Sequence, residues 1–341
     1  MYVPDRGKTR SRPSTPDRCS LKLCTDPTRG EMECHALTRG APPKTIMRKI
    51  GNYFKKEKWK KGLFLLGMVL FLSLPSYAGS IRDVRQNIER VKSIEPPFQF
   101  ALIGDSRDGE KVYTRLMRSA LDRKPHFFIH LGDMIPHSGE EEWSTFFEIS
   151  KPIDVPFFPV VGNHEVSAPS LGEKLYRKQF LLPEGKTYYA FRAGGTLFVV
   201  LNSEEERGRI VGAQRLWLEN ILSSSHETFK LVFLHRPLFL PIDSLKKGRA
   251  MDRHPHDRDA LHRLFLKTDV KAVFEADDHR YDRMEKDHIL YVITGGGGAP
   301  LASLRERGGF FHYIWISAQK GKMEGEVVNL EGRIQDRFVI K

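Results

Sequence analysis

The chain has 341 residues, 40% of them hydrophobic, so it is long enough for one large domain or two small ones and lacks the composition of a disordered protein. Its net charge of +12 suggests a polyanionic partner only until the charge is located. Residues 1–78 contain 16 Lys or Arg and 6 Asp or Glu, and the rest of the chain keeps a net charge of only +2. We therefore expect no nucleic-acid partner, because such binding requires a clear excess of basic residues.

Residues 47–78 have the pattern of an export signal. They begin with a basic segment at Met47, continue with a largely apolar segment of 13 residues from Gly62 to Leu74, and end in the small residues Ser76 and Ala78. A membrane span needs about 18 to 20 apolar residues, so we expect a signal peptide that is cleaved after Ala78, with an uncleaved anchor as the alternative. The sequence thus predicts a secreted or periplasmic protein that meets the membrane only transiently, or through that anchor.

Residues 1–46 are an extension in front of this signal, although export signals normally lie at the extreme N-terminus. The extension holds all three cysteines, Cys19, Cys24 and Cys34, whose spacing matches neither a zinc ribbon nor an even-numbered disulfide framework. It is rich in Pro, Arg and Thr and has no hydrophobic periodicity. We expect a disordered segment, or translation that begins at Met47.

Strands and helices are expected to alternate after a linker and short helix in residues 79–97. Each unit of strand and helix is about 30 residues long, which is typical of βαβ units in a parallel sheet. The expected strands cover residues 98–104, 126–132 and 156–162, and the expected helices cover residues 81–91, 112–124 and 141–149.

A second set of strands follows, beginning with a hairpin that turns at Gly194 and Gly195. Further strands are expected at residues 230–235, 271–276, 289–295, 312–318, 325–331 and 338–340, with helices at 213–222 and 257–269. Residues 98–341 are therefore expected to form one α/β domain, in which two packed mixed β-sheets are flanked by helices.

Polar residues follow a glycine at the end of each of the first three strands. They are Asp105, Asp133 and Asn163. Because ligands bind beyond the carboxyl ends of parallel strands, we expect these three loops to converge. Their side-chain oxygens are suitable ligands for hard divalent cations.

Two later strand ends add further donors, His235 in one loop and Asp277 with His279 in another. Six donors from five loops are too many for one tetrahedral metal. They fit two cations ~3.5–4 Å apart that share a bridging carboxylate. Such a pair suits phosphate chemistry, in which charge on the phosphate oxygens must be neutralised in the transition state.

The ordered motifs GDSR, GDMI, GNHE, LHRPLF and DDHRYDR resemble those of the calcineurin-like metallophosphoesterases. The phrases KTYYAFRAGGTLFVVLNSE, GAQRLWLENIL and VITGGGGAPL resemble the secreted, purple-acid-phosphatase-like branch of that family. The resemblance extends from Phe98 to about Leu301, and it implies a metallophosphoesterase-type sandwich and a phosphoric ester hydrolase.

The resemblance also implies a role for each matching residue. Two divalent ions would be bound, from among Fe, Zn, Mn and Mg. Asp105 and His279 would bind the first metal, Asp133 would bridge, and Asn163, His235 and Asp277 would bind the second. The adjacent His164 would donate a proton to the leaving oxygen or stabilise the transition state, and Glu165 would hold the His164 imidazole through a hydrogen bond.

Two positions depart from the family pattern. Arg107 stands where most members have a histidine ligand, and a guanidinium cannot bind a metal, although its planar fork could face the phosphate. The tyrosine with which purple acid phosphatases compensate is replaced by Pro136. Asp277 occupies the position of another histidine of the family. Its carboxylate adds negative charge, which favours Mn, Mg or Ca over zinc. On this pattern, Asn163, His235 and Asp277, the ligands of the second metal, form the better metal site of the two.

The sequence therefore predicts an exported metal-dependent hydrolase of phosphate mono- or diesters, which uses a metal-activated water at a dinuclear centre. The alternative is a non-catalytic or single-metal phosphate- or ligand-binding protein on a degenerate phosphatase scaffold. Outside this ligand set, the run from Gly295 to Gly298 lacks the ending of a nucleotide-binding loop and is expected to be a strand-ending turn. We expect His130 to lie in or beside the core, while His137 could replace a missing ligand.

Overall fold

The structure is a computed structural model that describes residues 81–341. The expected extension, the signal peptide and its cleavage after Ala78 lie outside the described residues. Within residues 81–341, every helix is too short or too polar to cross a bilayer.

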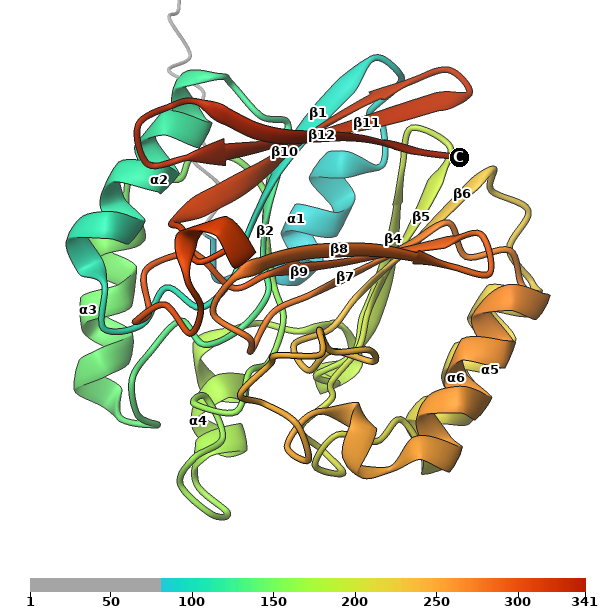
Figure 1. Cartoon of the computed structure of the whole chain (residues 1–341), viewed down its shortest axis with the longest axis horizontal. Coiled ribbons are helices and arrows are strands. Elements are labelled where there is room, and N and C mark those ends of the chain that lie inside the picture. The colour runs from blue at the N-terminus through green and yellow to red at the C-terminus, as the bar shows by residue number, and fades with distance from the viewer. Residues whose placement is uncertain (1–80) are drawn as a thin grey trace, which may run out of the picture. The chain divides into compact units, whose positions relative to one another are not determined.

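The first sheet combines the early parallel strands with the C-terminal antiparallel ones, in the order β12-β11-β10-β1-β2-β3 (Figure 1). β1 pairs in parallel with β2, and β2 pairs in parallel with β3, as the βαβ pattern predicts. β10 lies antiparallel on the other side of β1. The strands are β1 (Phe98–Ile103), β2 (Phe127–His130), β3 (Phe157–Pro159), β10 (His312–Gln319), β11 (Lys322–Asn329) and β12 (Ile334–Ile340).

The second sheet has the order β4-β5-β6-β7-β9-β8. Its four inner strands are parallel, and the hairpin partner at each edge is antiparallel. The strands are β4 (Tyr189–Ala193), β5 (Thr196–Val200), β6 (Phe229–Phe233), β7 (Ala272–Glu275), β8 (Tyr281–Lys286) and β9 (Ile289–Thr294).

Helices cover the outer faces, with α2 and α3 on the side of the first sheet and α5 and α6 on the side of the second (Figure 1). Apolar side chains of α5 and α6 form a cluster with the outer face of the second sheet. The helices are α1 (Val84–Val91), α2 (Glu110–Asp122), α3 (Glu140–Ser150), α4 (Gly172–Gln179), α5 (Gly212–Ser223) and α6 (Pro255–Lys267), with short 3-10 helices at Pro183–Gly185, Met251–Arg253 and Arg305–Arg307.

Aromatic side chains join the two sheets. Phe198 of the second sheet packs edge-on against Phe100 and Phe127 of the first, at ring-centroid distances of 5.4 and 5.3 Å. Phe158 stacks on Phe191 at 3.9 Å. These large apolar surfaces leave water together, which stabilises the face-to-face packing. The expected sandwich of two mixed sheets is confirmed.

Two elements are absent from the sequence prediction, α4 and β8. β8 has the sequence YDRMEK at the edge of its sheet, where charged side chains hide the strand pattern. α4 has the sequence GEKLYRKQ, in which only Leu175 and Tyr176 are large, buried apolar residues. Both elements lie next to loops of the predicted site, so the omission concerns the surroundings of the site more than the core.

Candidate metal centre

The backbone is strained at three of the predicted ligands. Asp105, Asp133 and Asp277 follow β1, β2 and β7 and have φ values of 57°, 54° and 61°. A residue with a side chain pays of order 1 kcal/mol for this left-handed conformation, which persists only where the surrounding structure enforces it. Such strain is concentrated at functional sites, so it supports a functional role for the three loops.

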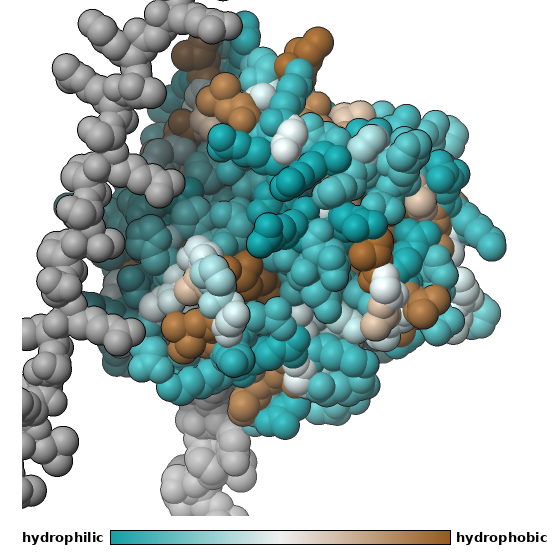
Figure 2. All heavy atoms as spheres, turned by 90° about the horizontal axis from the view of Figure 1, so that it is seen from below, coloured by the Kyte–Doolittle hydropathy of each residue, from teal (hydrophilic) through white to brown (hydrophobic). Residues whose placement is uncertain are grey.

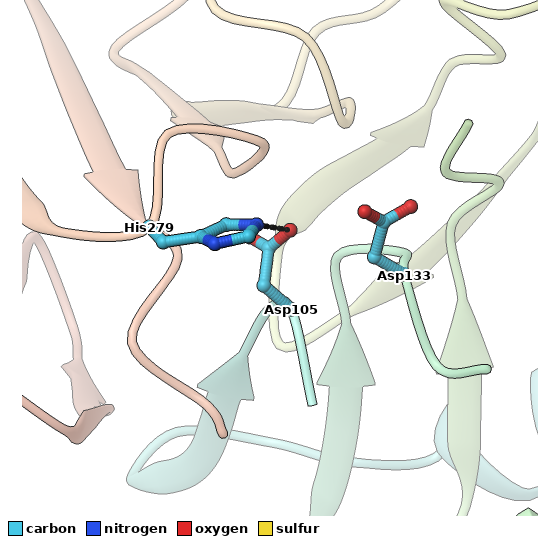
Figure 3. A group of neighbouring side chains, drawn as sticks. All are labelled: Asp105, Asp133 and His279. Atoms are coloured by element: carbon cyan, nitrogen blue, oxygen red, sulfur yellow. Dashed lines mark ion pairs between the residues drawn. The ribbon is translucent and has the colours of Figure 1, made fainter. Parts of the chain in front are cut away.

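The first group consists of Asp105, Asp133 and His279, whose ligand atoms all lie within 4.8 Å of one another (Figure 3). Nε2 of His279 is 3.4 Å from Oδ1 of Asp105, and within the described chain neither buried atom has a hydrogen-bond partner. Nδ1 of His279 donates to the Pro300 carbonyl at 2.8 Å, which leaves the lone pair on Nε2. Buried polar atoms without partners are costly, and a divalent cation would satisfy both.

The glycine run from Gly295 to Gly298 supports Asp105 from behind. It follows β9 directly, as predicted for a strand-ending turn. A Cβ on Gly295 would lie 2.7 Å from Oδ2 of Asp105, so only glycine permits this approach. The Ala299 amide also donates to the Asp105 carbonyl at 2.8 Å. The run therefore positions a metal-ligand loop.

The second group gathers around the imidazole of His235. Its Nε2 lies 3.3 Å from Oδ1 of Asn163, 3.3 Å from Oδ1 of Asp133 and 3.8 Å from Oδ1 of Asp277. Nδ1 of His235 donates to the Leu131 carbonyl at 2.8 Å, so Nε2 faces the other donors. The structure thus brings the three predicted ligands of the second metal together beside Asp133.

A lysine that the sequence prediction missed already contacts this second group. Nζ of Lys246 donates to Oδ1 of Asp277 at 2.6 Å, and Nη1 of Arg236 lies 3.9 Å from Oδ2. The second group therefore fits a divalent cation less well than the first, which is the reverse of the order that the sequence suggested. Arg236 could have been noticed beside His235, whereas Lys246 lies in a long loop without a spacing signal.

Arg107 and His164 both approach the Asp133 carboxylate. Nε of Arg107 lies 3.3 Å from Oδ2, and Nε2 of His164 lies 3.8 Å from the same oxygen. The His164 amide donates to Oδ1 at 3.0 Å. The predicted phosphate-facing cation and the predicted proton donor therefore lie beside the carboxylate that the two groups share.

The expected bond between Glu165 and the His164 imidazole is wrong. Glu165 is fully buried, and its carboxylate accepts backbone hydrogen bonds from Asp133 at 2.8 Å and from Met134 and Gly162 at 2.7 Å. Nδ1 of His164 donates instead to the Pro136 carbonyl. Consecutive side chains in this turn point in different directions, so Glu165 ties together the loops that follow β2 and β3.

Electrostatics link the groups. Burial raises the pKa of Asp133, but the neighbouring His235, His164 and Arg107 outweigh it and lower the pKa to about 2. Burial lowers the pKa of His235, but four carboxylates, of which Asp133 contributes most, raise it to about 9. A cation that enters the second group must therefore displace a proton from His235.

The remaining histidines of this region lie outside both groups. His130 is fully buried, its Nε2 lies 2.9 Å from Oγ of Ser106, and burial lowers its pKa to about 3. The predicted core position of His130 is confirmed. His137 is exposed, and its ring centroid is 6.4 Å from that of His164. His137 is not among the residues whose ligand atoms form the first group.

Residues 98–281 match the calcineurin-like phosphoesterase family. The chain belongs to this family. It is 30% identical over 196 residues to the human serine/threonine-protein phosphatase CPPED1, which covers 53% of this chain and 62% of the relative. It is 26% identical over 179 residues to purple acid phosphatase 13 of Arabidopsis thaliana, covering 47% of this chain and 32% of the relative. The chain thus spans less than two thirds of each relative's length.

The fold has a counterpart among solved structures. The purple acid phosphatase PPD1 from yellow lupin superposes with a TM-score of 0.63 at 18% identity, covering 73% of this chain and 55% of the lupin chain. This likeness confirms the sandwich fold of the calcineurin-like phosphoesterase. The family uses divalent metals, and the first group supplies a candidate site for one.

Proposed function

We propose that this calcineurin-like phosphoesterase hydrolyses phosphate mono- or diesters with the help of divalent cations. The observation that carries the proposal is the first group, in which a buried carboxylate oxygen of Asp105 and a buried imidazole nitrogen of His279 lie 3.4 Å apart and have no hydrogen-bond partner in the described chain. The family match and the phosphatase relatives support the same reaction class.

The residues would hold two cations with unequal strength. Asp105, Asp133 and His279 would hold the first, and Asn163, His235 and Asp277 would hold the second more weakly, because Lys246 must leave Asp277. When bound, such cations activate a water and neutralise phosphate oxygens. The carboxylate in the second group favours Mn or Mg there.

The chain's own side chains supply the remaining chemistry. The Pro136 carbonyl accepts a hydrogen bond from Nδ1 of His164. This bond holds the ring with Nε2 toward the shared Asp133 carboxylate, where Nε2, when protonated, would donate its proton to the leaving oxygen. The guanidinium of Arg107 lies at the bridging carboxylate, where two parallel hydrogen bonds to a phosphate oxygen pair are within its geometry.

Turnover of 4-nitrophenyl phosphate and bis(4-nitrophenyl) phosphate with added Mn²⁺ or Zn²⁺ tests the proposal. We expect hydrolysis by the purified protein and none by Asp133→Asn, which removes the shared negative charge but keeps the side-chain shape. Asp122→Asn is the matched control, since Asp122 is exposed on α2 and away from the site. The absence of turnover with every metal and both esters would overturn the proposal.

A second candidate is a phosphate- or ligand-binding protein with one metal or none. It is favoured by the two cations already in place, because Lys246 contacts Asp277 and Arg107 contacts Asp133. Metal analysis after dialysis discriminates the two. Metal-free protein that still binds phosphate supports the binder, whereas protein that retains metal and turns over the esters supports the hydrolase.

We further propose that the enzyme acts outside the cytoplasm. The pattern of residues 47–78 supports this, with its basic start, short apolar segment and small-residue end. Cell fractionation with N-terminal sequencing tests it. We expect the exported protein to begin at Gly79, and a cytoplasmic protein that keeps Met1 would contradict it.

A further inference from the structure

A basic pocket of about 510 Å³ lies beside the metal centre. Asn163 of the second group forms part of its wall, and Glu173 and Glu204 are its only acidic lining residues among those described. Its six basic lining residues are Lys174, Arg177, Arg207, Arg236, Arg249 and Arg253.

Only two of these six cations are neutralised. Arg177 pairs with Glu173 at 2.6 Å, and Arg236 pairs with Glu204 at 2.7 Å. The other four form no ion pair with a carboxylate anywhere in residues 81–341. The pocket therefore has a net charge of +4, and like charges gathered in a concave site create a field that attracts an anion.

The cations come from separate segments that the fold brings together. Lys174 lies on α4, Arg207 lies in the loop after β5, and Arg249 and Arg253 lie in and after the loop that follows β6. A run of charge on one helix would be a solvated face, but convergence of three segments on one hollow is a built arrangement. Figure 2 shows the molecule from below the view of Figure 1, which is the side where α4 lies. Hydrophilic side chains cover most of this face.

Arg236 connects the pocket with the metal centre. It follows the predicted ligand His235, its Nη1 lies 3.9 Å from Oδ2 of Asp277, and the Glu204 carboxylate fixes its guanidinium at the pocket wall. An anion in the pocket would therefore lie beside Asn163, a predicted ligand of the second metal, and Arg236 would lie between that anion and Asp277.

We propose that the preferred substrate is a phosphate ester whose leaving group carries a second phosphate, and that Lys174, Arg207, Arg249 and Arg253 bind this second phosphate. A dianion matches a pocket of charge +4 better than a neutral leaving group does, and guanidinium forks pair with phosphate oxygens through charge-assisted hydrogen bonds. The identity of the reaction rests on the proposed function, whereas the anion site itself does not.

Binding of two non-hydrolysable probes tests the site directly. Calorimetry of the metal-loaded protein should show that 1,3-phenylenebis(phosphonate) binds at least about tenfold more tightly than phenylphosphonate. The triple variant Arg207→Gln, Arg249→Gln, Arg253→Gln should reduce this preference to within about twofold. A control with the same charge change outside the pocket, Arg118→Gln, Lys124→Gln, Arg333→Gln, should keep it. Equal binding of the two probes by the wild type, or equal loss in both triple variants, would overturn the proposal.

Kinetics separate this proposal from the proposed function. The bisphosphate ester of resorcinol should be hydrolysed with a kcat/KM about tenfold above that for phenyl phosphate, beyond the twofold that its two equivalent esters allow. Turnover of both esters at equal rates would support the hydrolase and overturn the second-phosphate site. Failure to hydrolyse either ester, with the binding preference intact, would overturn the hydrolase and leave the anion site standing. If 3-carboxyphenyl phosphate matches the bisphosphate in kcat/KM, the choice of a second phosphate is wrong.

Discussion

The two ligand groups differ in what neutralises their carboxylates. In the first group, Oδ1 of Asp105 and Nε2 of His279 lie 3.4 Å apart and have no hydrogen-bond partner in the described chain. In the second group, Nζ of Lys246 already bonds to Asp277 at 2.6 Å. The sequence resemblance implies that Arg107 in the first group and Asp277 in the second each occupy the position of an imidazole ligand.

The two losses have different physical consequences. Replacing an imidazole by a carboxylate adds a buried negative charge, which must be paired to be tolerated, and Lys246 supplies the counter-charge at Asp277. Replacing an imidazole by Arg107 removes a ligand and places a guanidinium against Asp133, but it leaves Asp105 and His279 free to bind. A cation therefore meets no side-chain cation at Asp105 and His279, although Arg107 contacts the shared Asp133, whereas in the second group it must displace Lys246 from Asp277.

The largest expected effect is on the first group. Asp105→Asn removes a charged ligand, while its amide oxygen can still accept the Asp277 amide hydrogen that Oδ2 of Asp105 accepts at 3.0 Å. We expect kcat for 4-nitrophenyl phosphate to fall by ~10³, which corresponds to about 4 kcal/mol. Asp277→Asn should cost only about tenfold. An equal fall in both variants would remove the distinction between the groups.

A smaller effect is expected at His164, which approaches the carboxylate that both groups share. His164→Gln should lower kcat for phenyl phosphate by ~10², because phenoxide leaves poorly without a proton. With 4-nitrophenyl phosphate the loss should be several-fold smaller, since that leaving group needs little protonation. Steady-state rates with the two esters measure this, and the same loss for both would argue against proton donation.

His312, which holds the glycine run beside Asp105, should make the free energy of unfolding depend on pH. His312 holds the glycine run through its amide, which donates to the Gly296 carbonyl at 3.0 Å, and its Nδ1 donates to the Phe310 carbonyl. Burial lowers the pKa of His312 to about 4. The unfolded chain therefore takes up this proton first as the pH falls, and the free energy of unfolding should drop by ~2 kcal/mol between pH 6.5 and pH 5.

Urea unfolding of the metal-free protein at several pH values measures this effect. The comparison is with His312→Gln, which is less stable at pH 7 but has lost the titrating group, so its decline below pH 6.5 should be shallower by that amount. Other histidines and the carboxylates titrate equally in both proteins. Parallel curves for the two proteins would rule His312 out as the source.

The smallest effect is expected at Lys246. Lys246→Met removes the cation that competes for Asp277, so Mn²⁺ should bind the second group about tenfold more tightly, which is 1.4 kcal/mol. Lys246→Arg keeps the charge and serves as the control. The Mn²⁺ concentration for half-maximal activity reports the change, and an unchanged value in Lys246→Met would show that the lysine does not compete.

The sequence predicted the fold and the positions of the ligand residues because both follow from local patterns. A buried strand that ends in glycine and a carboxylate, as at Asp105 and Asp133, can be read from consecutive residues. The sequence predicted the α-helices and strands from α1 to β12 except α4 and β8, which the structure adds. Whether the six residues bind metal in the predicted roles stays a prediction.

The surroundings of the site could not be predicted, because long-range contacts set them. Lys246 reaches Asp277 across 31 residues of sequence, and nothing in its own neighbourhood indicates this. The sequence predicted that Glu165 would hold the His164 imidazole. The direction of its carboxylate depends on the backbone of the GNHE turn, which the sequence does not show. The basic pocket combines α4 with loops after β5 and β6, and no short sequence motif records that convergence.

Titration of the metal-free protein with Mn²⁺, followed by electron paramagnetic resonance or calorimetry, tests most directly the claim that the two groups bind metal unequally. We predict two binding steps that differ at least about tenfold in Kd, with the tighter step lost in Asp105→Asn and kept in Asp277→Asn. Two equal steps, or loss of the tighter step in Asp277→Asn alone, would contradict the account.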